Sequence, residues 1–349
     1  MTATETTPTA CWRADLDDYV QVLEVHPDGR QAVAGSLAGE AVLVDTADGT
    51  VTRLPRHELG VLSAAWSPDG ECLAVGGQDG LVRIRDRHGV ERAVVDGSGW
   101  VTGLAWSADA RLLAIGAGRR LLVVDRDGAF AGDFDGQTST VTGVAWSADG
   151  SRVGASAYGG VAWYDMVGSR AGRRRRFDWK GSLLCLAVSP DGRWACAGAQ
   201  DATVQLWRLW SGGDLAMSGY PAKIERLGFR SDSRWLAVAC MDELTVWDFA
   251  GRGPGGTAPA VASGHDQHIE DLAWTPSGSA VATGGADGRV IVWATPGRAG
   301  QKLSPITALE SDAGVGRLRW LGDDDLLVGR ADGGIVRLSL GTRSGQAAV

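Results

Sequence analysis

The chain is poor in lysine, has no close pair of cysteines and lacks long apolar runs. Among its 349 residues, lysine occurs only at positions 180, 223 and 302, whereas arginine is common, and the net charge is -8. This charge excludes a general footprint for nucleic acid or for an anionic membrane surface. No apolar run approaches the roughly 18 residues of a membrane-spanning helix, so we expect no membrane segment.

The five cysteines, at positions 11, 72, 185, 196 and 240, form no close-spaced metal-binding or redox motif. We expect Cys72, Cys196 and Cys240 to be small apolar core residues. The first 18 residues have neither a basic start nor an apolar core, so no secretory signal peptide is expected. These features favour a reduced, cytoplasmic protein.

One phrase recurs eight times along the chain. An apolar run is followed by a turn such as Ser67 to Gly70, a second apolar run, another turn and a third run. One anchor residue per copy marks the first turn: His26, Ser67, Ser107, Ser147, Ser189, Arg230, Thr275 and Leu321. The anchors lie between 40 residues (Ser67 to Ser107) and 46 residues (Thr275 to Leu321) apart. Periods of about 40–45 residues with several short strands each indicate the blades of a β-propeller.

The apolar runs are nearly continuous, as in Leu112 to Gly116, which indicates strands buried on both faces between neighbouring sheets. We therefore predict an all-β propeller of eight blades, each with four antiparallel strands, with seven blades as the alternative if one copy is degenerate. Residues 10–14 precede the first copy and are expected to complete the last blade, which closes the ring and removes an open edge. The predicted organisation is a disordered tail at 1–8, one propeller at 9–341 and a second tail at 342–349.

The seventh copy carries the clearest motif, with Gly264-His265 before its first strand, Thr283 in its second, Asp287 in the next turn and Trp293 in its third. On these residues the chain resembles the WD-repeat propeller family, over about residues 10–340 and in a divergent form that we expect to be of bacterial type. The resemblance implies that His265, Thr283, Asp287 and Trp293 form a buried structural network rather than a catalytic dyad.

The other copies depart from this motif. The second keeps His57 and Asp79, but Val75 and Arg85 replace the hydroxyl residue and the tryptophan. No nucleophile elbow, phosphate-binding loop, dinucleotide fingerprint or zinc-protease helix occurs. We therefore predict no catalytic residue, no cofactor and no metal. The acidic segments 125–128 and 323–325 are interpreted as hairpin turns, with cation binding as the alternative.

The loops before the first strands are expected to gather on one face. Aromatic and cationic side chains in these loops are the predicted partner-binding residues: Tyr19, Trp100, Trp179, Lys180, Tyr220, Lys223 and His268. Such side chains near a channel mouth suit a protein-binding hot spot. The leading hypothesis is a non-catalytic scaffold for a protein or peptide. A small-molecule or catalytic site at the channel mouth is the alternative, and a self-assembling subunit is a third interpretation.

One run of positive charge stands out in this acidic chain. It consists of Arg170, Arg173, Arg174, Arg175 and Arg176, where the outer strand of the fourth copy should begin. Charged edge strands protect sheets from edge-to-edge association. The alternative hypothesis is a basic rim patch that docks an acidic partner, because clustered cations create a strong local field.

Overall fold

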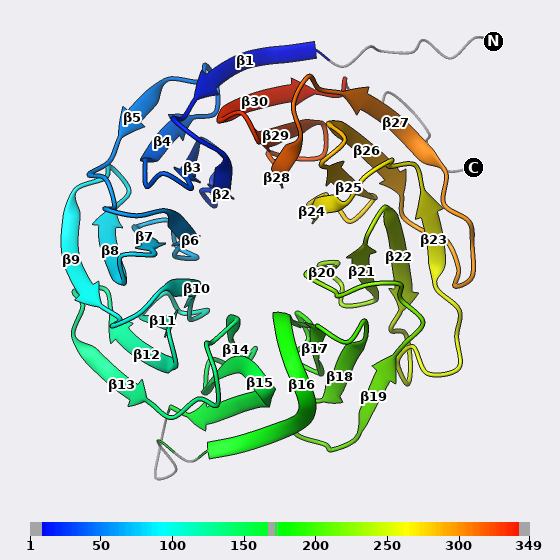
Figure 1. Cartoon of the computed structure of the whole chain (residues 1–349), viewed down its shortest axis with the longest axis horizontal. Helices are drawn as coiled ribbons and strands as arrows, with labels where there is room; N and C mark the ends of the chain where they lie inside the picture. The colour runs from blue at the N-terminus through cyan, green and yellow to red at the C-terminus, as the bar shows by residue number, and fades with distance from the viewer. Residues whose placement is uncertain (1–8, 167–171, 173, 342–349) are drawn as a thin grey trace.

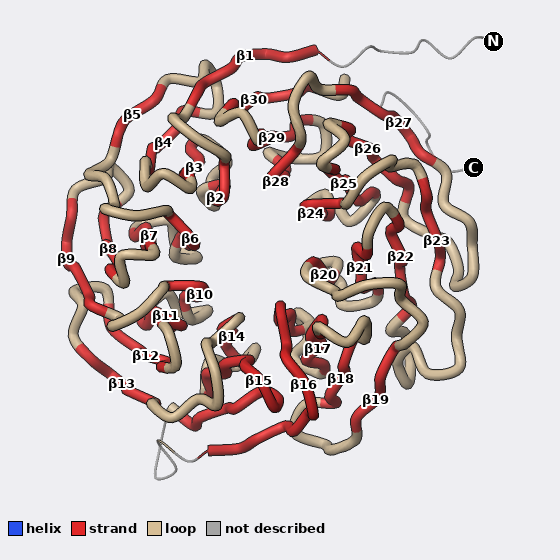
Figure 2. The backbone as a smooth tube through the Cα atoms, viewed as in Figure 1, coloured by secondary structure: helices blue, strands red, loops and turns tan. Residues whose placement is uncertain are grey.

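The computed structural model describes residues 9–166, 172 and 174–341, so the predicted tails at 1–8 and 342–349 lie outside the described residues. The described chain forms a ring of antiparallel sheets around a central channel (Figures 1 and 2). None of the described residues belongs to a helix long and apolar enough to cross a membrane. The fold is therefore an all-β propeller.

Six of the sheets have four strands each. In five of them the strands follow the order of the chain. The first four of these sheets are β2 (Val20–Val25), β3 (Gln31–Ser36), β4 (Ala41–Asp45) and β5 (Val51–Arg53); β6 (Val61–Trp66), β7 (Cys72–Gly77), β8 (Leu81–Asp86) and β9 (Glu91–Asp96); β10 (Val101–Trp106), β11 (Leu112–Ala117), β12 (Arg120–Asp125) and β13 (Phe130–Phe134); and β20 (Arg226–Phe229), β21 (Trp235–Cys240), β22 (Glu243–Asp248) and β23 (Ala260–Ser263). The fifth holds β24 (Ile269–Trp274), β25 (Ala280–Gly285), β26 (Arg289–Ala294) and β27 (Pro305–Glu310). The sixth joins the two ends of the described chain, with β28 (Val315–Trp320), β29 (Asp325–Arg330), β30 (Gly334–Ser339) and β1 (Thr9–Asp15).

The prediction of eight separate four-stranded blades is wrong, because the strands of the described residues form seven hydrogen-bonded sheets. The fourth and fifth copies share one six-stranded sheet, in the order β14-β15-β16-β17-β18-β19. Its members are β14 (Gly143–Trp146), β15 (Arg152–Asp165), β16 (Arg174–Val188), β17 (Trp194–Ala199), β18 (Val204–Arg208) and β19 (Asp214–Met217). β15 and β16 run on through positions where the repeat predicted breaks between strands. Repeat spacing counts copies, but it does not reveal where hydrogen bonding continues from one copy into the next.

The N-terminal strand completes the sheet of the last copy, as its position before the first copy suggested. β1 pairs antiparallel with β30, with Ala14 opposite Ile335, and it forms the outer edge of that sheet. Figure 1 shows this strand lying over the closing point of the ring. The two ends of the described chain are therefore held in one sheet, which removes an open edge.

The serine–aspartate turn of the repeat has a clear physical basis. In the second copy the Ser67 hydroxyl donates to Asp69 at 2.6 Å and accepts the backbone N–H of Cys72 at 2.9 Å. The same pattern recurs at Ser107, where the acceptor is Asp109, again at 2.6 Å. One hydroxyl thus links the end of the first strand to the start of the second, which explains why this turn recurs in the sequence.

Tryptophans at the end of the first strand join neighbouring copies. Each indole N–H donates to a backbone carbonyl of the preceding copy, for example Trp146 to Ala105 at 2.9 Å. The full set is Trp66 to Glu24, Trp106 to Ala65, Trp146 to Ala105, Trp274 to Gly228 and Trp320 to Ala273. These rings therefore pack between copies and also satisfy a carbonyl there.

An ionic contact strengthens the ring where its two ends meet. Arg319 on β28 contacts Glu24 on β2 at 2.6 Å and Asp271 on β24 at 2.9 Å. Burial alone would lower the pKa of Arg319, but the two carboxylates raise it above its ordinary value. Asp271 also accepts the backbone N–H of Leu318 at 2.9 Å. One guanidinium therefore connects the inner strands of three copies.

We expect Arg319→Met to destabilise the fold by about 2 kcal/mol, because it leaves Glu24 and Asp271 without their shared partner. The measurement is the thermal midpoint followed by circular dichroism. The matched control is Arg120→Met, which removes the surface ion pair with Asp133 and should cost at most about 1 kcal/mol. Equal midpoints for the two variants would contradict the role of Arg319 in closing the ring.

Candidate functional site

The four motif residues of the seventh copy are joined by hydrogen bonds in the interior. Nδ1 of His265 lies 3.1 Å from Asp287, and its Nε2 lies 2.8 Å from the hydroxyl of Thr283. The indole N–H of Trp293 donates to the same hydroxyl at 2.9 Å. Asp287 also accepts the backbone N–H groups of Asp266 and Arg289, which helps hold its pKa below the ordinary value despite the opposing effect of burial. Every polar atom of the imidazole has a partner, so this arrangement stabilises the copy.

The second copy lacks part of this network. His57 still contacts Asp79 at 2.9 Å, but Val75 supplies no hydroxyl, and the buried Nε2 of His57 has no hydrogen-bond partner among the described residues. The buried guanidinium of Arg85 stands in place of tryptophan. Its Nη2 lies 3.3 Å from Glu91, while its Nε and Nη1 have no partner in the part of the chain that the structure describes. Burial lowers the pKa of both His57 and Arg85. Such unsatisfied buried groups cost stability.

The sixth copy replaces the histidine with Tyr220, a predicted partner-binding residue. Tyr220 precedes Ile224 by four positions, as His265 precedes Ile269. Its hydroxyl lies 3.0 Å from that of Thr245 and accepts the indole N–H of Trp247 at 2.9 Å. Burial raises the pKa of Tyr220 to about 12. Its hydroxyl is therefore engaged inside the sixth copy, and repeat alignment could have shown this.

The propeller has two faces with different connections. The loop face carries the connections from each outer strand to the next inner strand, such as β5 to β6, together with the loops between second and third strands (Figure 1). The turn face carries the serine–aspartate turns and the connections from third to fourth strands. Five of the seven predicted partner-binding residues lie at connections of the loop face, whereas Trp179 and Lys180 lie within the long strand β16.

These seven residues differ in how far they are available. Trp100, Lys180, Lys223 and His268 are exposed, and Lys223 is paired with Glu225 at 2.9 Å. Trp179 is half-buried and packs on the core of the fifth copy. Tyr19 is also half-buried, with its ring against Gly316, and burial raises its pKa.

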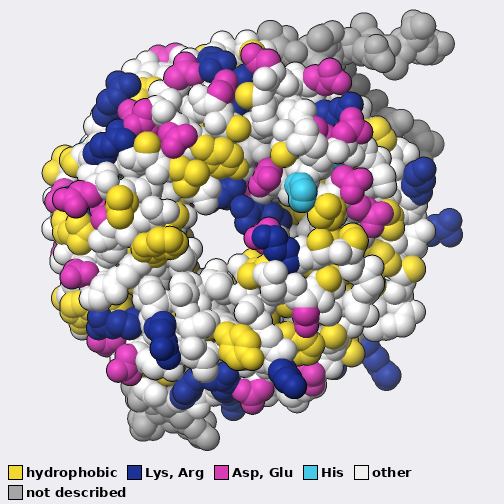
Figure 3. Space-filling view, in the orientation of Figure 1, with side chains coloured by type: hydrophobic (Ala, Val, Ile, Leu, Met, Phe, Trp, Pro, Cys, Tyr) yellow, Lys and Arg dark blue, Asp and Glu magenta, His cyan; other side chains and the backbone are white. Residues whose placement is uncertain are grey.

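Large exposed apolar side chains concentrate on the loop face. Of the ten such residues in the described chain, four lie at its connections: Leu37, Leu59, Trp100 and Met241. A fifth, Tyr158, lies within β15 beside the connection from β13 to β14, where its backbone N–H donates to Ser139 at 2.9 Å. Val90 is on the turn face, and the other four, Val94, Phe130, Leu215 and Ile306, lie on outer strands. Trp100, at 57% exposure, is one of the predicted partner-binding residues. No motif in the sequence pointed to the other four loop-face residues, because each is a single large apolar residue. Figure 3 shows apolar side chains around the central opening.

Charged side chains line part of the channel, visible as blue and magenta atoms within the opening in Figure 3. Glu24 and Asp271 are both paired with Arg319. Arg317 donates to the backbone carbonyl of Gly316 at 2.6 Å, and burial lowers its pKa. The carboxylates here serve ion pairs between copies, so this arrangement gives no support to an acid–base role at the channel mouth.

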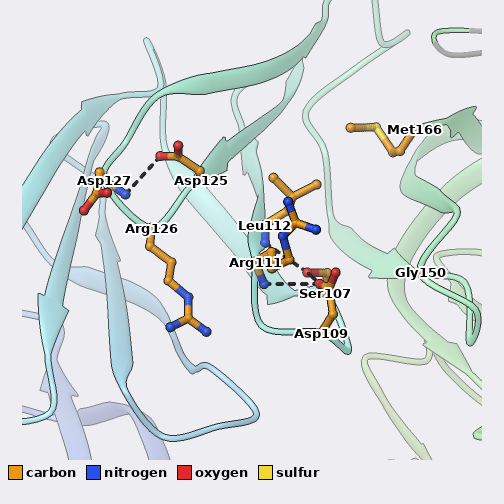
Figure 4. Close-up of a pocket in the computed structure, with 9 residues that line it drawn as sticks. All are labelled: Ser107, Asp109, Arg111, Leu112, Asp125, Arg126, Asp127, Gly150 and Met166. Atoms are coloured by element: carbon orange, nitrogen blue, oxygen red, sulfur yellow. Dashed lines mark hydrogen bonds between the residues drawn. The ribbon is translucent and has the colours of Figure 1, made fainter. Parts of the chain in front are cut away.

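A pocket of about 460 Å³ lies on the turn face between the third and fourth copies (Figure 4). Asp125 at its edge accepts the backbone N–H groups of Asp127 at 3.0 Å and Ala129 at 2.9 Å. Segment 125–128 is thus a hairpin turn. Arg126 is paired with Asp69 of the preceding copy. At the other acidic segment, Asp325 is paired with Arg337 at 3.0 Å.

The predicted basic rim patch is described only in part. Arg170 and Arg173 lie outside the described residues, whereas Arg174 and Arg175 are exposed on β16. Arg175 stands over the ring of Trp210, 5.5 Å from its centroid, and Arg176 is paired with Asp178 at 2.6 Å. The described arginines therefore lie along the outer part of the six-stranded sheet.

Three segments of the chain match a known repeat family. Residues 48–86, 174–208 and 257–294 match the family described as WD domain, G-beta repeat. These matches confirm the resemblance to WD-repeat proteins in three segments of the chain, which folds as a β-propeller.

Curated relatives include the small ribosomal subunit protein RACK1y of rice (Oryza sativa subsp. japonica), 31% identical over 35% of this chain and 38% of that protein. The small ribosomal subunit protein RACK1 of Schizosaccharomyces pombe is 29% identical over 35% of this chain and 40% of that protein. The alignments thus span about two fifths of these relatives. The C-terminal WD40 domain of Sif2 shares the fold, with a TM-score of 0.79 at 16% identity over 96% of this chain and 99% of that domain. The designed protein Ika8 does so with a TM-score of 0.75 at 20% identity, over 93% and 97%.

The seventh-copy network gives a stability prediction. Thr283→Val should destabilise the fold by about 2 kcal/mol, because it leaves buried atoms of His265 and Trp293 without a partner. The matched control is Thr307→Val on the outer strand β27, which should change the thermal midpoint little. A midpoint for Thr283→Val equal to that of the wild type would show that the network adds no stability.

The second copy gives the opposite prediction. The double variant Val75→Thr/Arg85→Trp rebuilds the arrangement of the seventh copy and removes a buried guanidinium with unsatisfied atoms. We expect its thermal midpoint to rise by about 2–4 °C for each kcal/mol gained. Arg85→Trp alone should gain less, since His57 Nε2 stays without a hydroxyl partner. An unchanged or lowered midpoint for the double variant would contradict this explanation.

Proposed function

We propose that the protein is a non-catalytic scaffold that holds a protein or peptide partner on its loop face. The observation that carries this proposal is the concentration of exposed apolar side chains at the connections of that face. Clustered apolar and aromatic side chains mark protein-binding surfaces, because their burial supplies most of the binding energy. The WD40 repeats and the relatives that carry them support a role in protein binding.

The centre of the proposed surface is formed by the first three copies. The loop holding Leu37 touches the loop holding Leu59, because a Cβ added at Gly60 would lie 2.5 Å from the carbonyl oxygen of Leu37. Trp100 follows in the next connection along the ring, and its carbonyl accepts the backbone N–H of Gly118 at 3.1 Å. Leu37, Leu59 and Trp100 therefore stand on adjoining loops fixed by the ring, a preorganised arrangement that limits the entropy lost on binding.

Cationic side chains supply orientation in this proposal. Lys180, Lys223 and His268 are exposed on the opposite part of the same face and would contact polar groups of the partner. Trp179 and Tyr19 would contribute apolar contact area at the inner edge of the loop face. We place the protein in the cytoplasm, a proposal supported by the small ribosomal subunit proteins among its relatives. The bacterial type of the repeats stays a prediction.

The test compares two triple variants that each remove three exposed apolar side chains. The loop-face variant is Leu37→Ala/Leu59→Ala/Trp100→Ala, and the control is Phe130→Ala/Leu215→Ala/Ile306→Ala on outer strands. Stoichiometric partners are captured from native lysate and mapped by cross-linking mass spectrometry. We expect the loop-face variant to lose affinity by about tenfold or more, while the control binds as the wild type does.

Two results would contradict the proposal. One is equal capture of the same partner by the loop-face variant and the wild type. The other is cross-links that fall only on outer strands or on the turn face. Matching circular dichroism spectra and thermal midpoints of the two variants would show that a loss of binding does not come from unfolding.

A further inference from the structure

A recess on the turn face between the fifth and sixth copies is lined by arginine. Two adjoining hollows, of about 380 and 310 Å³, share Trp194, Arg208 and Arg252, and the larger also contains Arg193. We call the surface formed by these four residues the arginine recess. It lies on the face opposite the proposed loop-face surface.

Arg208 departs from the chain's own repeat. It is the last residue of its third strand, a place that aspartate takes in five other copies: Asp45, Asp86, Asp125, Asp165 and Asp248. In most of them the carboxylate accepts a backbone N–H two residues later, as Asp248 does from Ala250 at 2.9 Å, and so stabilises the turn. A guanidinium cannot accept that bond. The arginine therefore does not serve the turn that the aspartate stabilises.

Two of the three guanidinium groups of the recess, those of Arg208 and Arg252, have no carboxylate partner among the described residues. Arg208 lies over the ring of Trp194, 5.0 Å from its centroid, and donates to the backbone carbonyl of Arg252 at 2.7 Å. Within the described residues, no carboxylate forms an ion pair with Arg208 or Arg252. Arg193 contacts Asp191 at 3.6 Å, with 74% of its own side chain exposed. Most of the hydrogen-bond donors of these three arginines remain available to a ligand.

The pocket of Figure 4 is the matching position between the third and fourth copies, and its charges differ. Leu112 pairs with Asp125 there as Trp194 pairs with Arg208, so Asp125 takes the place of Arg208. Arg111 corresponds to Arg193, each standing four residues after the serine of its turn. That pocket has three aspartates among its lining residues, whereas the larger hollow of the arginine recess has none. Compared with that pocket, the recess therefore has an arginine in place of an aspartate, and the guanidinium groups of Arg208 and Arg252 lack a carboxylate partner among the described residues.

The floor of the recess is preformed. Trp194 is buried and lies between Arg208 and the loop of Gly253. Gly253 has φ of +93°, and a Cβ there would lie 2.5 Å from Cζ2 of Trp194, so glycine is required for this close approach. The glycine-rich loop at 251–256 thus packs closely on the indole and fixes the position of Arg252.

We propose that the arginine recess binds an acidic peptide segment of a partner protein. One glutamate or aspartate carboxylate binds between Arg208 and Arg252, and a neighbouring carboxylate binds Arg193, since guanidinium groups pair with carboxylates through charge-assisted hydrogen bonds. Nucleic acid fits less well. Trp194 is buried and offers no ring face for a base, and Asp214 lines one end of the recess.

The probe is a short fluorescein-labelled peptide rich in glutamate and aspartate, and binding is measured by fluorescence anisotropy on the full chain. We expect the wild type to bind it. Arg252→Gln and Arg193→Gln should each weaken binding about tenfold, because each removes a charge-assisted hydrogen bond. Both side chains are exposed, so the fold should stay intact. The matched control, Arg111→Gln, removes the same charge from the corresponding turn and should bind as the wild type does.

Three outcomes would overturn the proposal. The first is no binding of the acidic peptide by the wild type at low salt. The second is an equal loss in Arg111→Gln and Arg193→Gln, which would indicate a nonspecific charge effect. The third is tighter binding of a phosphoserine peptide of equal length or of single-stranded DNA, which would assign the recess to phosphate. The loop-face variant should bind the probe normally, so this test is independent of the loop-face proposal.

Discussion

The hydrogen bond from a tryptophan indole to the carbonyl of the preceding copy is the contact on which the ring depends. It combines a large apolar ring at the boundary between copies with satisfaction of a backbone acceptor there, as Trp106 does with Ala65 at 3.1 Å. The contact recurs at five boundaries, and copies without it are joined in other ways. At the closing point Arg319 and strand β1 add ionic and backbone contacts. Because the interior holds the ring, the loops on both faces are free to differ between copies.

The strands and their order could be predicted because repeat spacing and continuous apolar runs are direct consequences of sheets packed against each other. The number of sheets could not. β15 and β16 carry hydrogen bonding through the fourth and fifth copies, and Gly159 and Gly160 there adopt positive φ. A strand that bends at glycine can either end there or continue its hydrogen bonding, and the local sequence permits both backbone conformations. Spacing therefore predicted the copies correctly but gave the wrong number of separate blades.

The candidate site shows a similar division. Position before an inner strand was enough to place Trp100 and Tyr220 on one face, since connectivity determines the face. Exposure was not predictable in the same way, because it depends on what each side chain finds nearby. The hydroxyl of Tyr220 forms hydrogen bonds with Thr245 and Trp247 in the interior, whereas Trp100 is 57% exposed. Leu37 and Leu59 are recognised as part of the loop-face surface only from their exposure in the structure.

A repeat protein supplies its own reference, because each copy shows what the fold requires at a given position. Arg85 and Arg208 both replace the residue that other copies use, yet they differ in consequence. Arg85 is buried, and two of its nitrogen atoms have no hydrogen-bond partner among the described residues, so it lowers the stability of the fold and is not accessible to a ligand. Arg208 lines a recess together with Arg252, where its guanidinium is accessible to a ligand from solution. A departure from the repeat therefore points to binding only where the altered side chain remains accessible. By that criterion the turn face offers a surface separate from the loop face, and a rigid ring between them allows both to be occupied at once.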